Sequence, residues 1–187
     1  MTRTKRRGRL VVAVSIAVSV VLGAGLYWLQ PWKLWQDETV REALPTVAGG
    51  PSATGSSGTG SSGTGAPPAA PVTVARGTLI SHEHSTTGAA ELIRLPDGSH
   101  TLRLVNLDTS NGPDLRVWLA DAPVKEGVAG WRVFDDGKHV SLGKLKGNKG
   151  DQNYPVPAGV NVADYTSISI WCDRFDVSFG AASLTSV

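Results

Sequence analysis

Cys172 is the residue whose chemistry stands out, because it is the only cysteine among 187 residues. It lies in the stretch SISIWCDRFDVSFG, residues 167–180. Exported proteins usually carry cysteines as disulfide pairs, and Cys172 has no partner in its own chain. The sequence leaves three roles open for it: a buried structural thiol, a redox group, or a covalent link between two copies of the chain.

The remaining metal-binding residue types predict no familiar metal centre. A blue-copper site needs one cysteine, two histidines and usually a methionine, but Met1 is the only methionine and no histidine follows Cys172. One cysteine is too few for a zinc–cysteine site or an internal disulfide. His82 and His84 would share one face of a strand, which makes them candidate metal ligands, although histidines in so polar a stretch are more often solvated.

Other polar clusters predict turns and loops. The stretches 111–114 and 135–137 carry oxygen ligands but fit no EF-hand spacing. The segment GKLKGNKGDQ, residues 143–152, lacks the order of a P-loop and predicts a solvated loop. Since no Ser-His-Asp order or paired carboxylates stand out, an enzyme in the ordinary sense is the least supported class.

A strand is expected to position Cys172. Ile168, Ile170 and Cys172 alternate onto one face, and after Asp173-Arg174 the apolar phase shifts to Phe175, Val177 and Phe179. The shift predicts a bulge or a tight bend directly after Cys172, with the thiol facing the core. An inward thiol argues against a covalent dimer.

The region 72–187 predicts an all-β fold, an antiparallel β-sandwich or jelly-roll-like domain. Short runs of alternating residues read as strands: TLRLVNL, LRVWLA, WRVF, SISIWC and DVSFG. Stretches rich in Gly, Pro, Asn and Asp separate them: LPDGSH, TSNGPD, DDGKH, KGNKGDQ and VPAGV.

The N-terminus predicts a membrane anchor. Residues 1–9 carry five basic side chains, and residues 10–29 are uncharged and mostly apolar, long enough for one transmembrane helix. The basic tail predicts a cytoplasmic N-terminus, so the remainder of the chain is extracytoplasmic at the cell membrane. A cleaved signal peptide is the alternative, but the apolar run is long and no A-x-A pattern follows it.

Two further segments separate this helix from the domain. Residues 30–48 form a juxtamembrane segment, in which residues 33–45 are expected to be a short helix that ends at Pro45. Residues 49–71, rich in Gly, Ser, Thr and Pro, predict a flexible tether or, equally, a cell-wall spacer. Outside the basic tail, 13 basic residues face 16 acidic ones, so nothing indicates nucleic-acid binding.

The domain resembles a known family in five stretches. These are GTL from Gly77, GAAEL from Gly88, LRLVNLDTSNGPDLRVWLA, LGKLKGNKGDQNYPVPAG, and YTSISIWCDRFDVSFGAASL from Tyr165. Together they resemble the DM-thirteen domain over residues 73–187. That family occurs in bacterial membrane-anchored proteins and in animal cell-surface proteins of the Skeletor type.

The resemblance implies a β-sandwich-like electron-transfer domain. The family's characteristic cysteine, matched here by Cys172, is suggested to act as a naked thiol or as a ligand of a group such as haem. This chain lacks the DOMON and b-type cytochrome domains found beside it in animal relatives, which implies a separate redox partner. The alternative is a binding module at the cell surface or cell wall, with Trp118 and Trp131 as its stacking residues.

Overall fold

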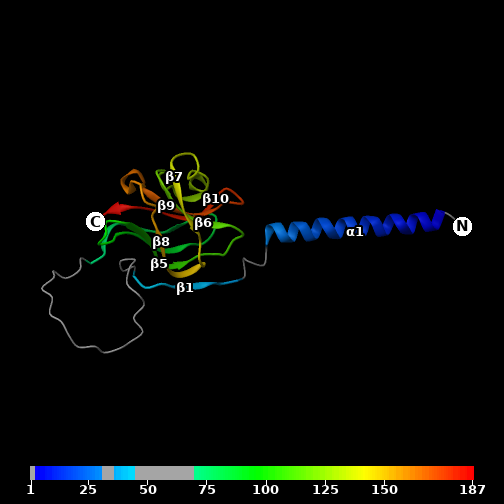
Figure 1. Cartoon of the computed structure of the whole chain (residues 1–187). Coiled ribbons are helices and arrows are strands. Elements are labelled where there is room, and N and C mark those ends of the chain that lie inside the picture. Colours follow the sequence, from blue (N-terminus) through cyan, green and yellow to red (C-terminus); the bar gives the residue numbers. More distant parts are fainter. Residues whose placement is uncertain (1–2, 31–35, 45–69) are drawn as a thin grey trace, which may run out of the picture.

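The computed structural model describes residues 3–30, 36–44 and 70–187. Its only long helix in that part of the chain, α1 (Arg3–Leu29), projects away from the other elements (Figure 1). The window Val12–Leu29 has a mean hydropathy of 2.1, and none of it is buried. By length and composition this helix is consistent with a membrane anchor, and a signal sequence would pass the same test.

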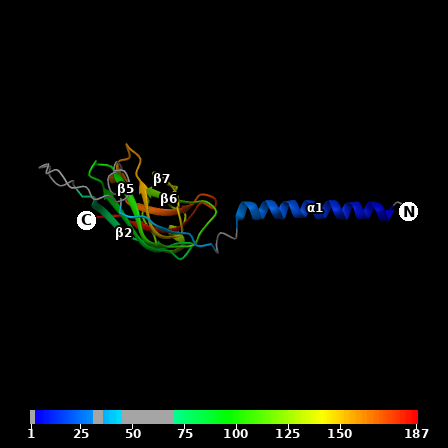
Figure 2. The ribbon, with the colours of Figure 1, turned by 60° about the horizontal axis from the view of Figure 1, so that its bottom comes forward.

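The strands form two sheets that pack face to face, so the expected all-β sandwich behind an apolar helix is confirmed (Figures 1 and 2). Sheet A has the order β1-β8-β5-β4-β2-β11 and sheet B the order β3-β10-β9-β6-β7. The strands of sheet A are β1 (Thr39–Arg41), β8 (Lys149–Pro155), β5 (His100–Asp108), β4 (Thr87–Arg94), β2 (Val72–Thr78) and β11 (Thr185–Ser186). Those of sheet B are β3 (Ile80–Ser81), β10 (Val177–Ser183), β9 (Ser167–Cys172), β6 (Leu115–Ala120) and β7 (His139–Lys144). In the described part of the chain, the short 3₁₀ helices η2 (Gly127–Gly130) and η3 (Val162–Asp164) lie in the connections.

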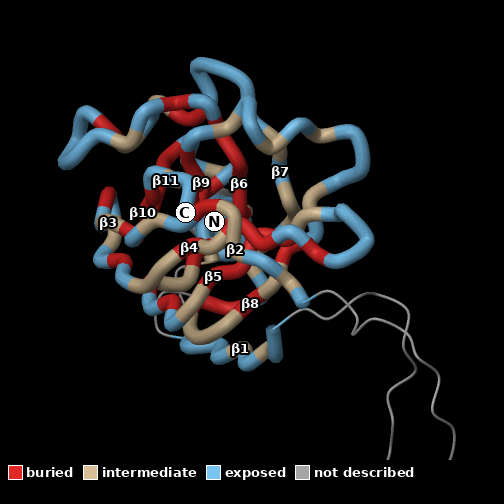
Figure 3. The backbone as a smooth tube through the Cα atoms, turned by 90° about the vertical axis from the view of Figure 1, so that its left-hand side faces the viewer, coloured by how far each residue is buried: buried red, intermediate tan, exposed pale blue. Residues whose placement is uncertain are grey.

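The main core fills the space between the sheets, where buried segments of both sheets face each other in Figure 3. Alternation along each strand explains its composition, because every second side chain points to the same face. Fully buried members include Leu102 and Leu104 from β5 and Ile168, Ile170 and Cys172 from β9. The predicted inward face of Cys172 is therefore confirmed.

A second, smaller core covers the opposite face of sheet B. Trp118 and Trp171 lie on that face, and Phe134 from the connection between β6 and β7 packs with them. The predicted strand WRVF is wrong: residues 131–134 form turns. Their apolar side chains are explained by this second core, because Phe134 is fully buried without any strand partner.

The predicted juxtamembrane segment also differs from its prediction. Residues 39–41 are a strand, not part of a helix, and β1 lies parallel to β8 at the edge of sheet A. Residues 31–35 and 45–69, which include most of the predicted tether, lie outside the described residues. The predicted loop KGNKGDQ is wrong in its second half, because β8 begins at Lys149.

Candidate functional site

The candidate site is the end of the β9–β10 hairpin. Cys172 pairs with Val177, and residues 173–176 make the turn between them, as the phase shift predicted. The Phe175 amide donates to the Cys172 carbonyl at 3.2 Å, and Asp176 takes a left-handed backbone with φ 50°. Phe175 itself is 41 % exposed, so its expected place in the apolar core set is wrong.

The Cys172 thiol is enclosed on all sides. The side chain is 0 % exposed and belongs to the main core together with Leu115, Val177 and Phe179. Burial raises the pKa of this thiol, and hydrogen bonding from the backbone at Arg174, Phe175 and Asp114 offsets only part of that rise. In the closed structure the sulfur is therefore a protonated, protected thiol with backbone amides close to it.

Side chains from other loops hold the 173–176 turn in place. Arg132 donates from Nη1 to the carbonyl oxygens of Phe175 and Asp176, both at 3.2 Å. Arg116 Nε lies 2.8 Å from a carboxylate oxygen of Asp173, whose amide donates to the Asp114 carbonyl at 3.0 Å. These contacts cross from the β6 side of sheet B and from the β6–β7 connection, so the turn is closed over Cys172 by residues distant in sequence.

His82 forms a separate buried polar chain. Its Nδ1 lies 2.8 Å from the Ser178 hydroxyl and its Nε2 lies 3.0 Å from the Lys125 carbonyl. Ser169 donates to Ser178 at 2.9 Å. Burial lowers the pKa of the His82 imidazole, and the contact with Lys125 offsets part of the shift. The sequence alone did not single out Ser169 and Ser178, although a serine among the apolar residues of each predicted strand was a usable signal.

His84 does not share this environment, because residues 82–84 bend rather than continue the strand. Its ring packs on Phe179 with centroids 3.9 Å apart, and Nε2 lies 3.7 Å from a Glu83 carboxylate oxygen. Among the described residues no group of three or more His, Cys, Asp or Glu side chains is placed to hold a metal ion.

The two tryptophans considered for ligand stacking are already packed. Trp118 stacks on His139 at 4.1 Å and on Trp171 at 4.8 Å between ring centroids, and it is only 6 % exposed. Trp131 packs partly buried against the main core. Their rings therefore stabilise the two sides of sheet B and leave little free face for a ligand.

A haem does not fit at Cys172 in this structure. An axial thiolate must be deprotonated and must face the iron directly. Here the sulfur has no exposed surface, and burial raises the pKa of the thiol.

Fold and site together define an all-β sandwich domain with one enclosed thiol at a hairpin end. A family model described as "Electron transfer DM13" matches residues 78–184, more than half of the chain. The chain belongs to this family. The match runs from the end of β2 to just beyond β10 and includes Cys172, but it does not include α1 or β1. No curated protein and no solved structure matches the chain.

Proposed function

We propose that this protein is a membrane-tethered extracytoplasmic electron-transfer protein whose redox group is the Cys172 thiol. The single observation that carries the proposal is the enclosed thiol beneath a turn held by Arg132 and Arg116, in a domain of an electron-transfer family. Five basic residues ahead of an apolar helix support an uncleaved signal-anchor with the N-terminus in the cytoplasm. Family membership and this anchor support a place at the bacterial cell surface.

The closed turn assigns the thiol a gated chemistry. While the turn is closed, a partner cannot reach the sulfur, and burial keeps the thiol protonated. When the turn opens, the proton passes to water and the sulfur becomes a thiolate. Hydration and the neighbouring backbone amides then stabilise the negative charge.

The exchange step needs two partners, a disulfide acceptor and a dithiol donor. The Cys172 thiolate attacks one sulfur of the acceptor disulfide; a new S–S bond forms as the old one breaks, and the departing sulfur leaves as a thiolate with the electron pair. The donor carries two thiols. One donor thiolate attacks the Cys172 sulfur of the new bond; a donor–Cys172 disulfide forms, and the acceptor sulfur leaves as a second thiolate, so the acceptor disulfide is fully reduced. The second donor thiolate then attacks the donor sulfur bonded to Cys172, which closes the donor disulfide and releases Cys172 as a thiolate that regains its proton. Two electrons have then moved from donor to acceptor, and Cys172 has returned to its starting state.

Trapping of mixed disulfides tests this function. Membranes that contain the full chain are quenched with acid, and adducts on Cys172 are sought by mass spectrometry, with Cys172→Ser as the control. We expect an adduct with a second thiol-bearing molecule, more abundant in Arg132→Ala because the turn opens more often. Absence of any Cys172 adduct in both the wild type and Arg132→Ala would sink the proposal.

A further inference from the structure

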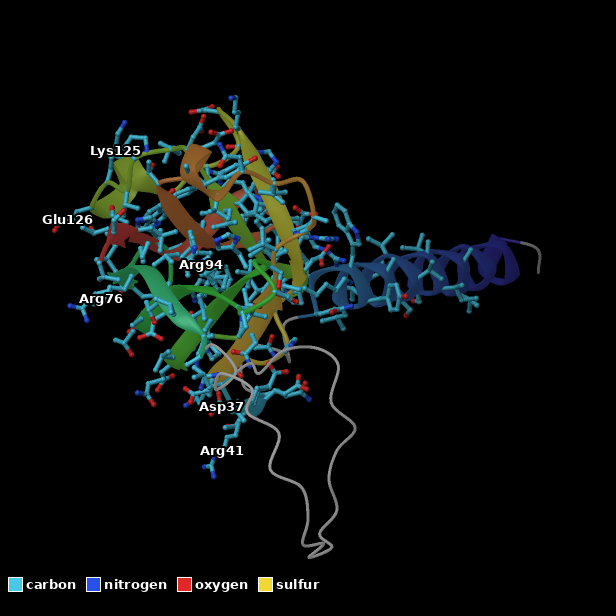
Figure 4. All side chains as sticks on the ribbon, turned by 60° about the vertical axis from the view of Figure 1, so that its left-hand side comes forward. Asp37, Arg41, Arg76, Arg94, Lys125 and Glu126 are labelled. Atoms are coloured by element: carbon cyan, nitrogen blue, oxygen red, sulfur yellow. The ribbon has the colours of Figure 1, made fainter. Side chains whose placement is uncertain are left out.

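The membrane-proximal segment, residues 36–44, is seated along the β8 edge of sheet A (Figures 1 and 4). Thr39, Val40 and Arg41 lie in parallel register with Lys149, Gly150 and Asp151. The backbone bonds include Lys149 N–H to the Glu38 carbonyl at 3.1 Å and Glu42 N–H to the Asp151 carbonyl at 3.0 Å. Figure 4 shows Arg41 extending away from the domain, as expected on an edge strand.

Asn148 binds the start of the segment. Its side chain is 1 % exposed; Oδ1 accepts from the Glu38 amide at 2.7 Å, and Nδ2 donates to an Asp37 carboxylate oxygen at 2.8 Å. Lys149 Nζ lies 3.2 Å from the other Asp37 oxygen. A buried amide whose oxygen and nitrogen both meet this segment would lose those partners if the segment left.

Glu42 fastens the end of the segment. One carboxylate oxygen accepts from Lys146 Nζ at 2.7 Å, and the other accepts from the Asn153 amide at 2.6 Å. Arg103 Nη1 donates to the carbonyls of Glu42 and Ala43 at 3.1 and 3.2 Å. Acidic side chains on the segment thus meet basic side chains around β8.

Two glycines make room for the segment. A Cβ at Gly147 would overlap the Glu38 carbonyl oxygen and the Val40 side chain, and a Cβ at Gly150 would overlap the Val40 carbonyl oxygen. All the nearest atoms at both positions belong to the segment and none to the rest of the domain. The motif Lys146-Gly147-Asn148-Lys149-Gly150 is therefore shaped to receive this strand.

We propose that the β8 edge is a strand-binding surface whose ligand is the segment 36–44 of the same chain, and that this docking holds the Cys172 end of the domain next to the membrane. The second half rests on the anchor proposed above. With the segment docked, residues 30–35 alone separate α1 from the segment, a reach of at most roughly 25 Å. With the segment released, residues 30–71 would separate them, a reach of up to roughly 140 Å.

A contact between the 173–176 turn and α1 supports the placement of the Cys172 end on the α1 side of the domain. The guanidinium carbon of Arg174, in the 173–176 turn, lies 5.6 Å from the centre of the Trp28 ring near the end of α1. Docking of β1 thus brings the turn over Cys172 to the side of the domain that faces α1. The predicted tether then becomes a connection between β1 and β2, and the partner of Cys172 must reach it close to the membrane surface.

Disulfide capture tests the docking and identifies its occupant. In a Cys172→Ser background, Thr39→Cys with Lys149→Cys joins two residues in register; Thr39→Cys with Asn153→Cys, four residues further along β8, is the matched control. We expect rapid formation of an intramolecular disulfide in the first pair and at least about tenfold less in the control. Equal yields in the two pairs would overturn docking in this register, and a doubled mass would show that a second copy of the chain is the occupant.

Gly147→Ala then tests what the docking does. In vesicles with a lipid-borne acceptor dye, energy transfer from a donor on the domain should fall in Gly147→Ala relative to wild type, because the released domain moves outward. The same substitution should change nothing when residues 36–44 are replaced by a Gly/Ser stretch of equal length. Unchanged transfer in a chain that still carries α1 would overturn the membrane-proximal placement, whereas loss of α1, seen as a shorter mass with disulfide capture intact, would remove the anchor and leave the docking standing.

Discussion

Two regions of this domain are held together by different kinds of contact: the Cys172 end of the β9–β10 hairpin and the β8 edge of sheet A. At the hairpin end, Cys172 lies in the main core with Leu115, Val177 and Phe179, and its polar contacts come from the 173–176 turn and the Asp114 backbone. Along β8, the segment 36–44 is attached through ion pairs and hydrogen bonds, many of them partly exposed. The stability of apolar packing that excludes water depends little on salt, pH or reagents, whereas all three weaken exposed charge pairs. The apolar packing therefore protects the Cys172 thiol, whereas salt or a change of pH can weaken the contacts that hold the segment 36–44.

Phe179→Ala should give the largest loss of unfolding free energy, because it removes an aromatic ring from the core around Cys172. Phe179 is 2 % exposed and packs in the core that contains Cys172. Truncation of a buried phenylalanine costs about 3–5 kcal/mol of unfolding free energy. Phe175→Ala is the matched control, since Phe175 is 41 % exposed in the adjacent turn and should cost less than about 1 kcal/mol. Urea unfolding measures both, and equal costs would contradict the closed packing described for this end.

His82→Phe should rank second. It leaves the Ser178 hydroxyl and the Lys125 carbonyl without their imidazole partner, which costs about 1–3 kcal/mol. Because the pKa of folded His82 lies below its ordinary 6.5, the unfolded chain binds the proton first as pH falls below that value. The unfolding free energy of the wild type should therefore fall as the pH drops below about 6.5, and this loss should level off once the pH lies below the pKa of folded His82. His84→Phe should keep this pH dependence and His82→Phe should lose it; a slope retained in His82→Phe would contradict the assignment.

The sequence alone predicted part of this fold and missed part of it. Period-two alternation located β6 and β9 at their observed bounds and placed Cys172 inward, because each strand has one face in the main core. It failed at Val133 and Phe134, which pack on the outer face of sheet B from a turn. It also failed around β1 and β8. β1 pairs with β8 about 110 residues further along the chain, as the 110-residue separation of Glu38 and Asn148 shows, and β8 pairs on its other side with β5. Local composition there indicated a helix and a loop, and only the long-range pairing makes both segments strands.

Glu42→Gln should give a smaller effect, confined to the charged edge. It removes the ion pair with Lys146 while an amide oxygen can still accept from the Asn153 backbone. A partly exposed pair of this kind contributes about 0.2–1 kcal/mol. Cleavage by trypsin at Arg41, which is protected by strand pairing, should rise by a small factor, and Glu126→Gln, on an exposed loop, should leave it unchanged. Equal cleavage of the wild type and Glu42→Gln would show that this pair does not hold the segment.

Acid should release the segment while the sandwich stays folded. Burial raises the pKa of Glu42, but hydrogen bonds from Lys146 and Asn153 outweigh it and hold that pKa below its ordinary 4.5. Hydrogen bonds from Asn148 and Lys149 hold the pKa of Asp37 below 3.8. Because the pKa values of both carboxyl groups are lowered in the docked state, the ionised groups stabilise docking at a pH above their ordinary pKa values. This contribution is lost as the pH falls below those values. Hydrogen exchange of residues 36–44 should therefore speed up, relative to β5, only below pH about 4.

The gated thiol is tested most directly by the rate at which Cys172 reacts with a small aromatic disulfide in the native full-length protein. We expect a slow rate in the wild type, a rate at least about tenfold higher in Arg132→Ala, and the full rate of a free thiol in denaturant. Glu126→Gln should react like the wild type. A native thiol that reacts at the denatured rate would contradict the closed turn. If Arg132→Ala reacts no faster than the wild type, and Cys172 reacts only on global unfolding, the thiol is a packed structural residue and the gated redox role is wrong.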